Sequence, residues 1–258
     1  MISILSPAKS MNFEDPAPTD NFTIPEFKSE TLELVNVLKK YSTGRLMKLM
    51  GVSEKIATLN RERYESFSPD FDLQNAKQAL FAFTGDVYRH MRINTYSSQT
   101  LTFAQRHLRI LSGLYGFLKP LDIIQPYRLE MKTSIKVKRA KNLYDFWGRK
   151  LTDIVNRELA QDESAALINL ASKEYSRVIN FKEVKAPVYT MTFKEVERGK
   201  ATVIAIYAKW ARGMMADHIL HKQIQDPEDL KSFNEAGYQF SATDSSATEW
   251  IFTRLKPE

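Results

Sequence analysis

The chain has 258 residues, 43% of them hydrophobic, which is ample material for a packed core and excludes disorder for most of its length. Its formal net charge is +6, a moderate basic bias that permits an anionic partner without requiring one. It contains no cysteine, which excludes disulfides, thiolate metal sites, iron–sulfur clusters and catalysis by a thiol.

The first residues of the chain predict a buried strand that leads into a polar turn. Three of residues 2–5 are apolar, and Ser6 and Lys9 follow this stretch around a proline. The N-terminus has no basic region ahead of its short apolar run, so it does not resemble a signal peptide. No apolar run reaches the roughly 18 residues of a membrane span. We therefore expect a cytoplasmic protein without membrane contact.

Residues 29–92 predict a helical region that could form a subdomain. A proline-rich stretch at 14–25 is expected to cross the surface as a loop. Apolar residues at helical spacing then predict a helix over 29–40. Further along, Thr84 or Asp86 is expected to cap a short helix.

Residues 45–64 predict two helices joined by a tight turn. Gly51 and Val52 form the turn, and Ser53 is expected to cap the second helix. The apolar helix end, the Gly-x-Ser turn and Lys55 resemble the helix-hairpin-helix motif, whose backbone N–H groups bind a DNA phosphate. Ser53 replaces the usual second hairpin glycine, and an ordinary packed pair of helices fits the same pattern.

Residues 109–131 combine glycines, prolines and polar side chains within an apolar context, which is typical of a loop that builds a site. The glycines and prolines exclude one long helix. We expect a strand, a turn, a single helical turn around 120–124, and a strand-like piece in which Arg128 and Glu130 share one face. The basic run that follows, over 132–141, is expected to face solvent as a strand or its connection.

The second half of the chain begins with the clearest helix. Its apolar stripe covers 142–159, with Asn142 as the N-cap. A buried strand is expected at 167–171, and a helical turn starts at Ser172.

The C-terminal part predicts two antiparallel hairpins with a helix between them. The first hairpin covers 189–207 and the second 238–252. The helix over 209–223 is expected to carry Lys209 and Arg212 on its first turn, where positive charge opposes the helix dipole.

Cationic side chains at the predicted ends of elements suit the binding of phosphate oxygens. The candidates are Lys9, Arg128, Lys173, Lys209 and Arg212, with Glu130 and Asp244 as candidate acids or bases. Each cation alone also fits a surface ion pair, so the functional interpretation requires that they converge in space. His218 and His221 have no acidic cluster beside them, so we expect no metal site, and no glycine-rich motif indicates a bound cofactor.

The predicted elements together indicate an α+β fold. We expect a single compact domain over residues 1–258, with a mixed sheet, surrounding helices and a helix-hairpin-helix element. No internal repeat or linker divides the chain.

Several long motifs resemble the YaaA family of bacterial peroxide-stress-resistance proteins. They are ILSPAK, FTGDVY, LSGLYGFLKPLDIIQPYRLEM, LYDFWG, INLASKEY, YAKWARG and FNEAGYQF, and they span nearly the whole chain. The resemblance implies a cytoplasmic protein that limits free iron under hydrogen peroxide stress and binds double-stranded or branched DNA. It also implies a helix-hairpin-helix and a positively charged cleft lined by the cations named above.

The leading hypothesis is a non-catalytic, monomeric protein that binds DNA independently of its sequence. Phosphate capture would use the backbone N–H groups of Gly51, Val52 and Ser53 with Lys55, together with the basic cleft. The alternative is an enzyme acting on a nucleotide or nucleic acid, with Glu130 or Asp244 as the acid or base. Direct iron binding is a weaker third possibility, because the sequence offers no ligand cluster.

Overall fold

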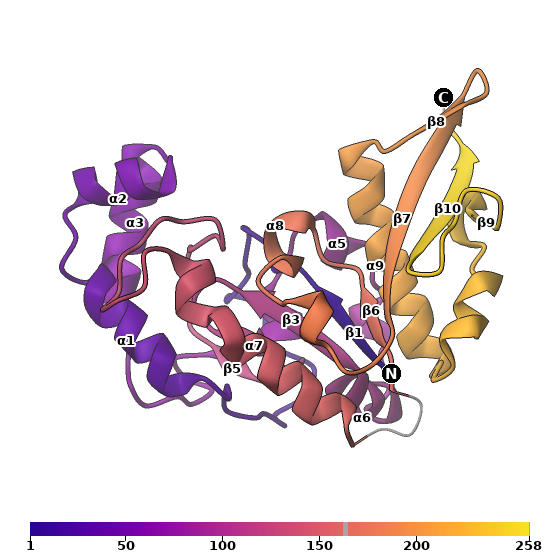
Figure 1. Cartoon of the computed structure of the whole chain (residues 1–258). Helices are drawn as coiled ribbons and strands as arrows, with labels where there is room; N and C mark the ends of the chain where they lie inside the picture. Colours follow the sequence, from indigo (N-terminus) through magenta and orange to yellow (C-terminus); the bar gives the residue numbers. More distant parts are fainter. Residues whose placement is uncertain (162–164, 258) are drawn as a thin grey trace.

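The computed structural model describes residues 1–161 and 165–257, which form one compact α/β structure around an eight-stranded mixed sheet (Figure 1). The strands lie in the order β4-β3-β1-β6-β7-β10-β9, and β8 pairs with β7. Their bounds are β1 (Ile2–Leu5), β3 (Leu108–Ser112), β4 (Gly116–Leu118), β6 (Leu167–Asn169), β7 (Val188–Glu197), β8 (Lys200–Thr202), β9 (Gln239–Ser241) and β10 (Glu249–Leu255). A separate small sheet pairs β2 (Lys77–Gln78) with β5 (Ile123–Ile124).

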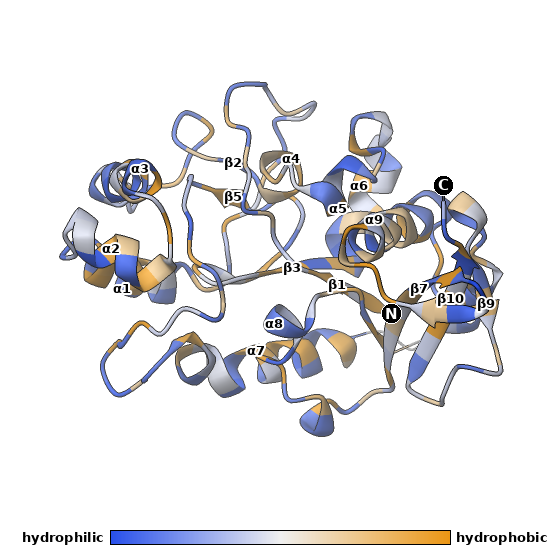
Figure 2. Cartoon of the chain, turned by 90° about the horizontal axis from the view of Figure 1, so that it is seen from above, coloured by the Kyte–Doolittle hydropathy of each residue, from blue (hydrophilic) through white to orange (hydrophobic). Residues whose placement is uncertain are grey.

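The helices cover both faces of the sheet (Figure 2). The α-helices are α1 (Lys28–Leu38), α2 (Thr43–Met50), α3 (Glu54–Glu65), α4 (Ala79–Ala82), α5 (Asp86–Arg89), α6 (Ser98–His107), α7 (Leu143–Leu159), α8 (Lys173–Ser176) and α9 (Ala205–Lys222). The 3-10 helices are η1 (Ile93–Thr95), η2 (Phe181–Glu183), η3 (Pro227–Ser232) and η4 (Glu235–Gly237). In Figure 2, α5, α6 and α9 lie on one side of the sheet, and α7 and α8 lie on the other.

The five strands β3, β1, β6, β7 and β10 run parallel to one another. Strand β1 is buried along its whole length, Ser3 included, as expected for a mostly apolar central strand that is covered on both faces. The antiparallel pairs are β3 with β4, β7 with β8, and β9 with β10. The expected mixed sheet with surrounding helices is therefore confirmed.

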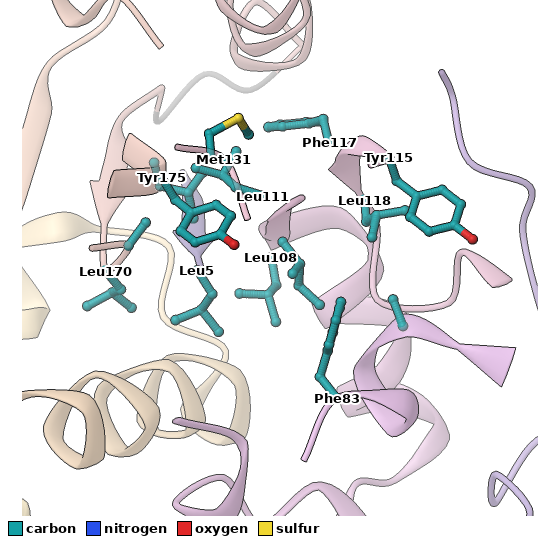
Figure 3. Close-up of a cluster of buried hydrophobic side chains, with 14 of the residues drawn as sticks. Leu5, Phe83, Leu108, Leu111, Tyr115, Phe117, Leu118, Met131, Leu170 and Tyr175 are labelled. Carbon is teal, nitrogen blue, oxygen red and sulfur yellow. The ribbon is translucent and has the colours of Figure 1, made fainter. Parts of the chain in front are cut away.

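The sheet and its covering helices share one hydrophobic core. Figure 3 shows part of it, where Leu5 of β1, Leu108 of β3, Phe117 of β4 and Tyr175 of α8 belong to one cluster of buried side chains. The same cluster includes Leu46 of α2, so the helical region is packed into the common core.

Several predicted elements are confirmed. Helix α7 begins after Asn142, whose side chain accepts a hydrogen bond from the backbone N–H of Asp145. The helix predicted over 29–40, the strand predicted at 167–171 and the C-terminal hairpin are present with adjusted ends. The basic run after residue 131 is an irregular connection, one of the two forms expected, and its side chains alternate between exposed and buried over residues 132–138.

The helical turn predicted at 120–124 is wrong. The Asp122 side chain accepts a hydrogen bond from the backbone N–H of Lys119, and residues 123–124 pair with β2 as strand β5. The following piece is not a strand either, and residues 125–130 are irregular. Glu130 is buried together with its neighbours Leu129 and Met131, although an alternating strand would place it on the face opposite to them. Tertiary packing therefore overrides the alternating pattern.

Two helix starts also differ from the predictions. Gly85, and neither Thr84 nor Asp86, is the N-cap of α5. Ser53 occupies the N-cap position of α3, but its side chain makes no capping hydrogen bond.

Helix α9 begins at Ala205, because the return strand β8 ends at Thr202 rather than continuing to residue 207. Lys209 and Arg212 therefore lie beyond the first turn of α9, where the dipole opposes their charge less than predicted. Within the described part of the chain, no helix is long and apolar enough to cross a membrane.

Candidate functional site

The candidate site lies where two neighbouring parallel strands, β1 and β6, end. From β1 the chain continues to β3 on one side, and from β6 it continues to β7 on the other side. Crossovers that leave adjacent strands in opposite directions open a crevice at their carboxyl ends, which is the usual ligand position in such sheets. The backbone N–H of Leu170 donates to the carbonyl of Ile4 (3.0 Å), so the two strand ends are level.

A pocket of about 570 Å³ occupies this crevice. Its floor includes Ser6, after β1, and Ser172, after β6. The Ser6 Oγ accepts a hydrogen bond from the backbone N–H of Ser172 (2.9 Å) and donates one to the Ser172 Oγ (3.2 Å). The other lining residues are Pro7, Ala8, Lys9, Ser10, Gly85, Asp86, Val87, Tyr88, Arg89, Glu130, Leu170, Glu174, Tyr175, Val203, Ala205, Ala208, Lys209 and Arg212.

Glu130 is the buried carboxylate of this pocket. Its Oε1 lies 3.5 Å from the Lys9 Nζ and 3.1 Å from the Arg128 Nη2, while the side chain is only 7% exposed. Its Oε2 is buried and has no hydrogen-bond partner among the described residues. The site therefore contains an acceptor oxygen that pairs with no group in the described part of the chain.

The cations on α9 differ in how they are paired. Lys209 lies 3.2 Å from the Asp86 carboxylate and is half exposed. Arg212, three residues further along the helix, has no carboxylate within ion-pair distance in the described ranges, and its buried Nε has no hydrogen-bond partner there. Burial lowers the pKa of the Arg212 guanidinium below its usual value. Arg212 therefore carries a desolvated charge that the described part of the protein does not neutralise.

Two glycines allow the elements of the site to approach closely. A Cβ atom on Gly213 would lie 2.0 Å from the carbonyl oxygen of Val87, so only glycine allows α9 to contact α5 here. A Cβ atom on Gly113 would lie 2.1 Å from the carbonyl oxygen of Leu129. This second contact holds the segment that carries Arg128 and Glu130 against the end of β3.

A second pocket, of about 710 Å³, adjoins the turn between α2 and α3. It is lined by Arg45, Lys48, Leu49, Met50, Gly51, Glu130, Lys132, Thr133 and Ser134. Glu130 lines both pockets. The turn that resembles a DNA-binding hairpin and the crevice at the carboxyl ends of β1 and β6 therefore share a wall.

The turn itself has fewer free donors than the sequence predicts. Gly51 is left-handed (φ 61°), and the N–H groups of both Gly51 and Val52 donate to the carbonyl of Met47. Ser53 N–H has no backbone acceptor within the described segments, and α3 follows it directly. A phosphate would therefore meet Ser53 and the first turn of α3 rather than the N–H groups of Gly51 and Val52.

The structure brings together five of the eleven predicted site residues. Lys9, Glu130, Lys209 and Arg212 line one pocket, with Arg128 ion-paired behind Glu130. Val52, Ser53 and Lys55 line neither pocket, and Ser53 and Lys55 are exposed at the start of α3. Lys173 is exposed on α8 outside the lining. Asp244 lies apart, in the turn between β9 and β10, where it accepts a hydrogen bond from the Ser241 Oγ (2.6 Å).

Sequence reasoning missed some residues of the site. Asp86 holds Lys209, although the sequence suggested only a capping role for it. Arg45, Lys48 and Lys132 line the second pocket. Their only signal was positive charge, in the predicted hairpin for Arg45 and Lys48 and in the basic run over 132–141 for Lys132. Over residues 1–161 and 165–257, no group of three or more His, Asp or Glu side chains could hold a metal ion.

The fold and site define an α/β protein with a charged, ligand-sized pocket at the carboxyl ends of its central strands. The family model described as "Peroxide stress protein YaaA" matches residues 1–244, and the chain belongs to this family. It is 46% identical to a UPF0246 protein of Cellvibrio japonicus over 100% of both chains. It is 47% identical to a UPF0246 protein of Acaryochloris marina over 98% of this chain and 100% of the relative. Membership of the family gives the protein a role in the peroxide stress response.

Proposed function

We propose that the protein acts in the cytoplasm as a DNA-binding protein of the peroxide stress response and recognises duplex or branched DNA without reading its sequence. The observation that carries the proposal is the shared wall between the two pockets. Arg45, Lys48 and Lys132 line one pocket, and Lys9 and Lys209 line the other. Cations spread over adjoining pockets suit the spaced phosphates of a nucleic-acid backbone.

The hairpin would hold one phosphate. Gly51 is exposed, and nothing lies within 4 Å of the position its Cβ would take, so a DNA backbone can approach the turn closely. The Ser53 N–H and the N-terminus of α3 supply donors and a favourable dipole. Lys55, exposed in the first turn of α3, adds a charge. Backbone N–H groups, a helix N-terminus and a lysine are suited to phosphate oxygens, so recognition would depend on the DNA backbone.

The salt dependence of binding tests the proposal. Each phosphate neutralised by a cation contributes about −0.9 to the slope of log K against log salt concentration on duplex DNA. We expect a slope steeper than about −3 on duplexes of unrelated sequence, with affinities that agree between sequences. A slope near zero, or affinity confined to one sequence, would contradict the proposal.

We also propose that the protein limits free iron during peroxide stress, as the family resemblance implies. The supporting observation is membership of the peroxide-stress family. The test is chelatable iron in peroxide-treated cells with and without the protein, with the Lys55→Ala and Lys209→Ala variants supplied in parallel. Equal iron in cells with and without the protein would refute this role.

A second candidate function is catalysis on a nucleotide or nucleic acid with Glu130 as the acid or base. The supporting observation is its buried Oε2, which is free of partners within the described residues. Asp244 lies outside both pockets and does not support this role. Glu130→Gln should abolish any such activity while leaving duplex affinity unchanged. Equal loss of activity and affinity would argue against it.

A further inference from the structure

The pocket between β1 and β6 has features that backbone binding of DNA does not require. It is a concave site of about 570 Å³, within the range of small-molecule pockets, which is roughly 300–1,000 Å³. It also lies at the strand ends where the chain connections diverge, the usual position for a nucleotide in a doubly wound sheet. The side chains of the pocket indicate which ligand it would take.

One end of the pocket is built for an anion. Lys209 and Arg212 lie three residues apart on α9, so they share a face of that helix. Arg212 is largely desolvated and has no acidic partner in the part of the chain that the structure describes, which costs free energy that a bound anion would recover. A guanidinium fork and an ammonium group together match the oxygens and double charge of a phosphate monoester better than a single carboxylate.

The two serines on the floor add a directed donor. The Ser6 hydroxyl hydrogen is used in the bond to Ser172, because Ser6 Oγ donates to Ser172 Oγ. The Ser172 hydroxyl hydrogen has no acceptor within the described residues and is available to a ligand. A phosphate oxygen is a suitable acceptor for it.

The lining of the pocket also contains an acceptor for a ligand hydrogen-bond donor, together with apolar groups. Glu130 Oε2 is buried and unpartnered among described residues, so a ligand N–H or O–H would satisfy it. Leu170, Tyr175 and Val203 add apolar groups to the lining of the same pocket. A ligand that combines a dianion, an apolar ring and ring or sugar donors is a nucleotide.

We propose that this pocket binds the phosphate monoester of a nucleotide, with Arg212, Lys209 and Ser172 at the phosphate and Glu130 at the nucleoside. The same chemical group occurs in a free nucleoside monophosphate and at the 5′-phosphorylated end of a DNA strand. This proposal shares Lys209 with the proposed duplex-binding surface, but nucleotide binding and duplex binding are measured separately, so either proposal can fail alone.

Calorimetric titration of the full-length protein with dAMP tests the proposal, alongside deoxyadenosine, inorganic phosphate, and a short single strand with either a 5′-phosphate or a 5′-hydroxyl. We expect the phosphorylated nucleoside or strand to bind at least tenfold more tightly than its dephosphorylated counterpart and than inorganic phosphate. Preference for dAMP assigns the site to free nucleotides, and preference for the phosphorylated strand assigns it to strand ends. Binding that is indifferent to the phosphate, binding of inorganic phosphate alone, or no binding would overturn the proposal.

Matched variants locate the site. Lys209→Ala and Arg212→Gln should each weaken binding of the phosphorylated ligand at least tenfold, and Glu130→Gln should reduce the preference for it over inorganic phosphate. Arg149→Gln, an exposed ion-paired arginine on α7, is the control that should bind as the wild type does.

Lys209 is half exposed, so Lys209→Ala keeps the test valid if the Arg212 variant does not fold. Unchanged binding by Lys209→Ala would overturn the assignment. Loss of ligand binding in Lys209→Ala with normal ligand binding in Lys55→Ala separates this site from the hairpin.

Discussion

Asp122 shows how burial of a single carboxyl group makes stability depend on pH. Burial raises the pKa of Asp122 to about 6, although hydrogen bonds from the Thr23 Oγ1 (2.6 Å) and the Lys119 N–H (2.7 Å) oppose that shift. An unfolded aspartate has a pKa of about 3.9, so the folded state holds this proton more tightly. The contribution of Asp122 to the free energy of unfolding is therefore complete below about pH 4, and it is lost as the pH rises through about 6.

Asp122→Asn should remove this pH dependence. As the pH rises from about 4 to 7, the wild type should lose up to roughly 3 kcal/mol of unfolding free energy relative to the variant. Denaturant titrations at several pH values measure the difference. Asp153→Asn, on an exposed carboxylate of α7, should follow the wild type. Parallel profiles for wild type and Asp122→Asn would show that the Asp122 pKa is not raised.

Gly213→Ala tests the close contact between α9 and α5. The added carbon would lie 2.0 Å from the backbone oxygen of Val87, so one of the two helices must move. We expect a loss of about 1–3 kcal/mol in unfolding free energy. Gly44→Ala, where nothing lies within 4 Å of the added carbon, is the control and should be neutral or stabilising. Equal stability of the two variants would contradict the described packing.

Much of the candidate site could be predicted from single residues. Charged residues are unusual in an apolar stretch, and they stand out at the end of a predicted strand or helix. Lys9, Arg128, Glu130, Lys209 and Arg212 were found in this way, and they converge. Asp86 was not, because its role depends on where α5 packs against α9. Asp244 was misplaced for the same reason, since sequence does not tell which turns meet in space.

The turn between α2 and α3 allows a test at the scale of elements. Gly51 ends α2 in the left-handed conformation, with φ of 61° and open space around its Cβ position. Gly51→Ala should therefore destabilise the protein through backbone strain alone, by about 1–2 kcal/mol. Gly44→Ala in the same helix should instead stabilise it by up to about 1 kcal/mol. Thermal unfolding of the pair measures both effects, and a neutral Gly51→Ala would argue against the left-handed turn.

Periodicity predicted most elements, and the failures share one physical cause. Helices α1, α3 and α7 and strand β1 follow from local apolar patterns. The segment at 120–130 does not, because β5 pairs with a strand more than 40 residues earlier and Glu130 is buried by distant packing. The start of α9 was misjudged because β8 ends earlier than its apolar pattern suggests.

At the scale of the whole molecule, the shared core predicts one cooperative unit. Leu34 of α1 and Leu46 of α2 belong to the same buried cluster as Ile4 of β1, and the Tyr64 hydroxyl on α3 donates to the Arg128 carbonyl. We therefore propose that residues 1–258 unfold together, without a separate helical subdomain.

The tryptophans allow the cooperativity of unfolding to be measured. Trp147, Trp210 and Trp250 all lie outside α1–α3, so their fluorescence follows the sheet and its covering helices. Far-ultraviolet circular dichroism follows all helices. We expect the two thermal transitions to coincide. Loss of helical signal before the fluorescence changes would show that α1–α3 form an independent unit.

The central claim is that one protein surface binds DNA through its phosphates. This surface runs from the hairpin between α2 and α3 to the pocket at the carboxyl ends of β1 and β6. The most direct test is the affinity of the wild type, Lys55→Ala and Lys209→Ala for a duplex and a four-way junction across a salt series, with Arg149→Ala as the exposed control. Each site variant should weaken binding to both DNAs and make the salt slope shallower by about one unit, and the control should match the wild type. Unchanged affinity and slope in both site variants would contradict the claim.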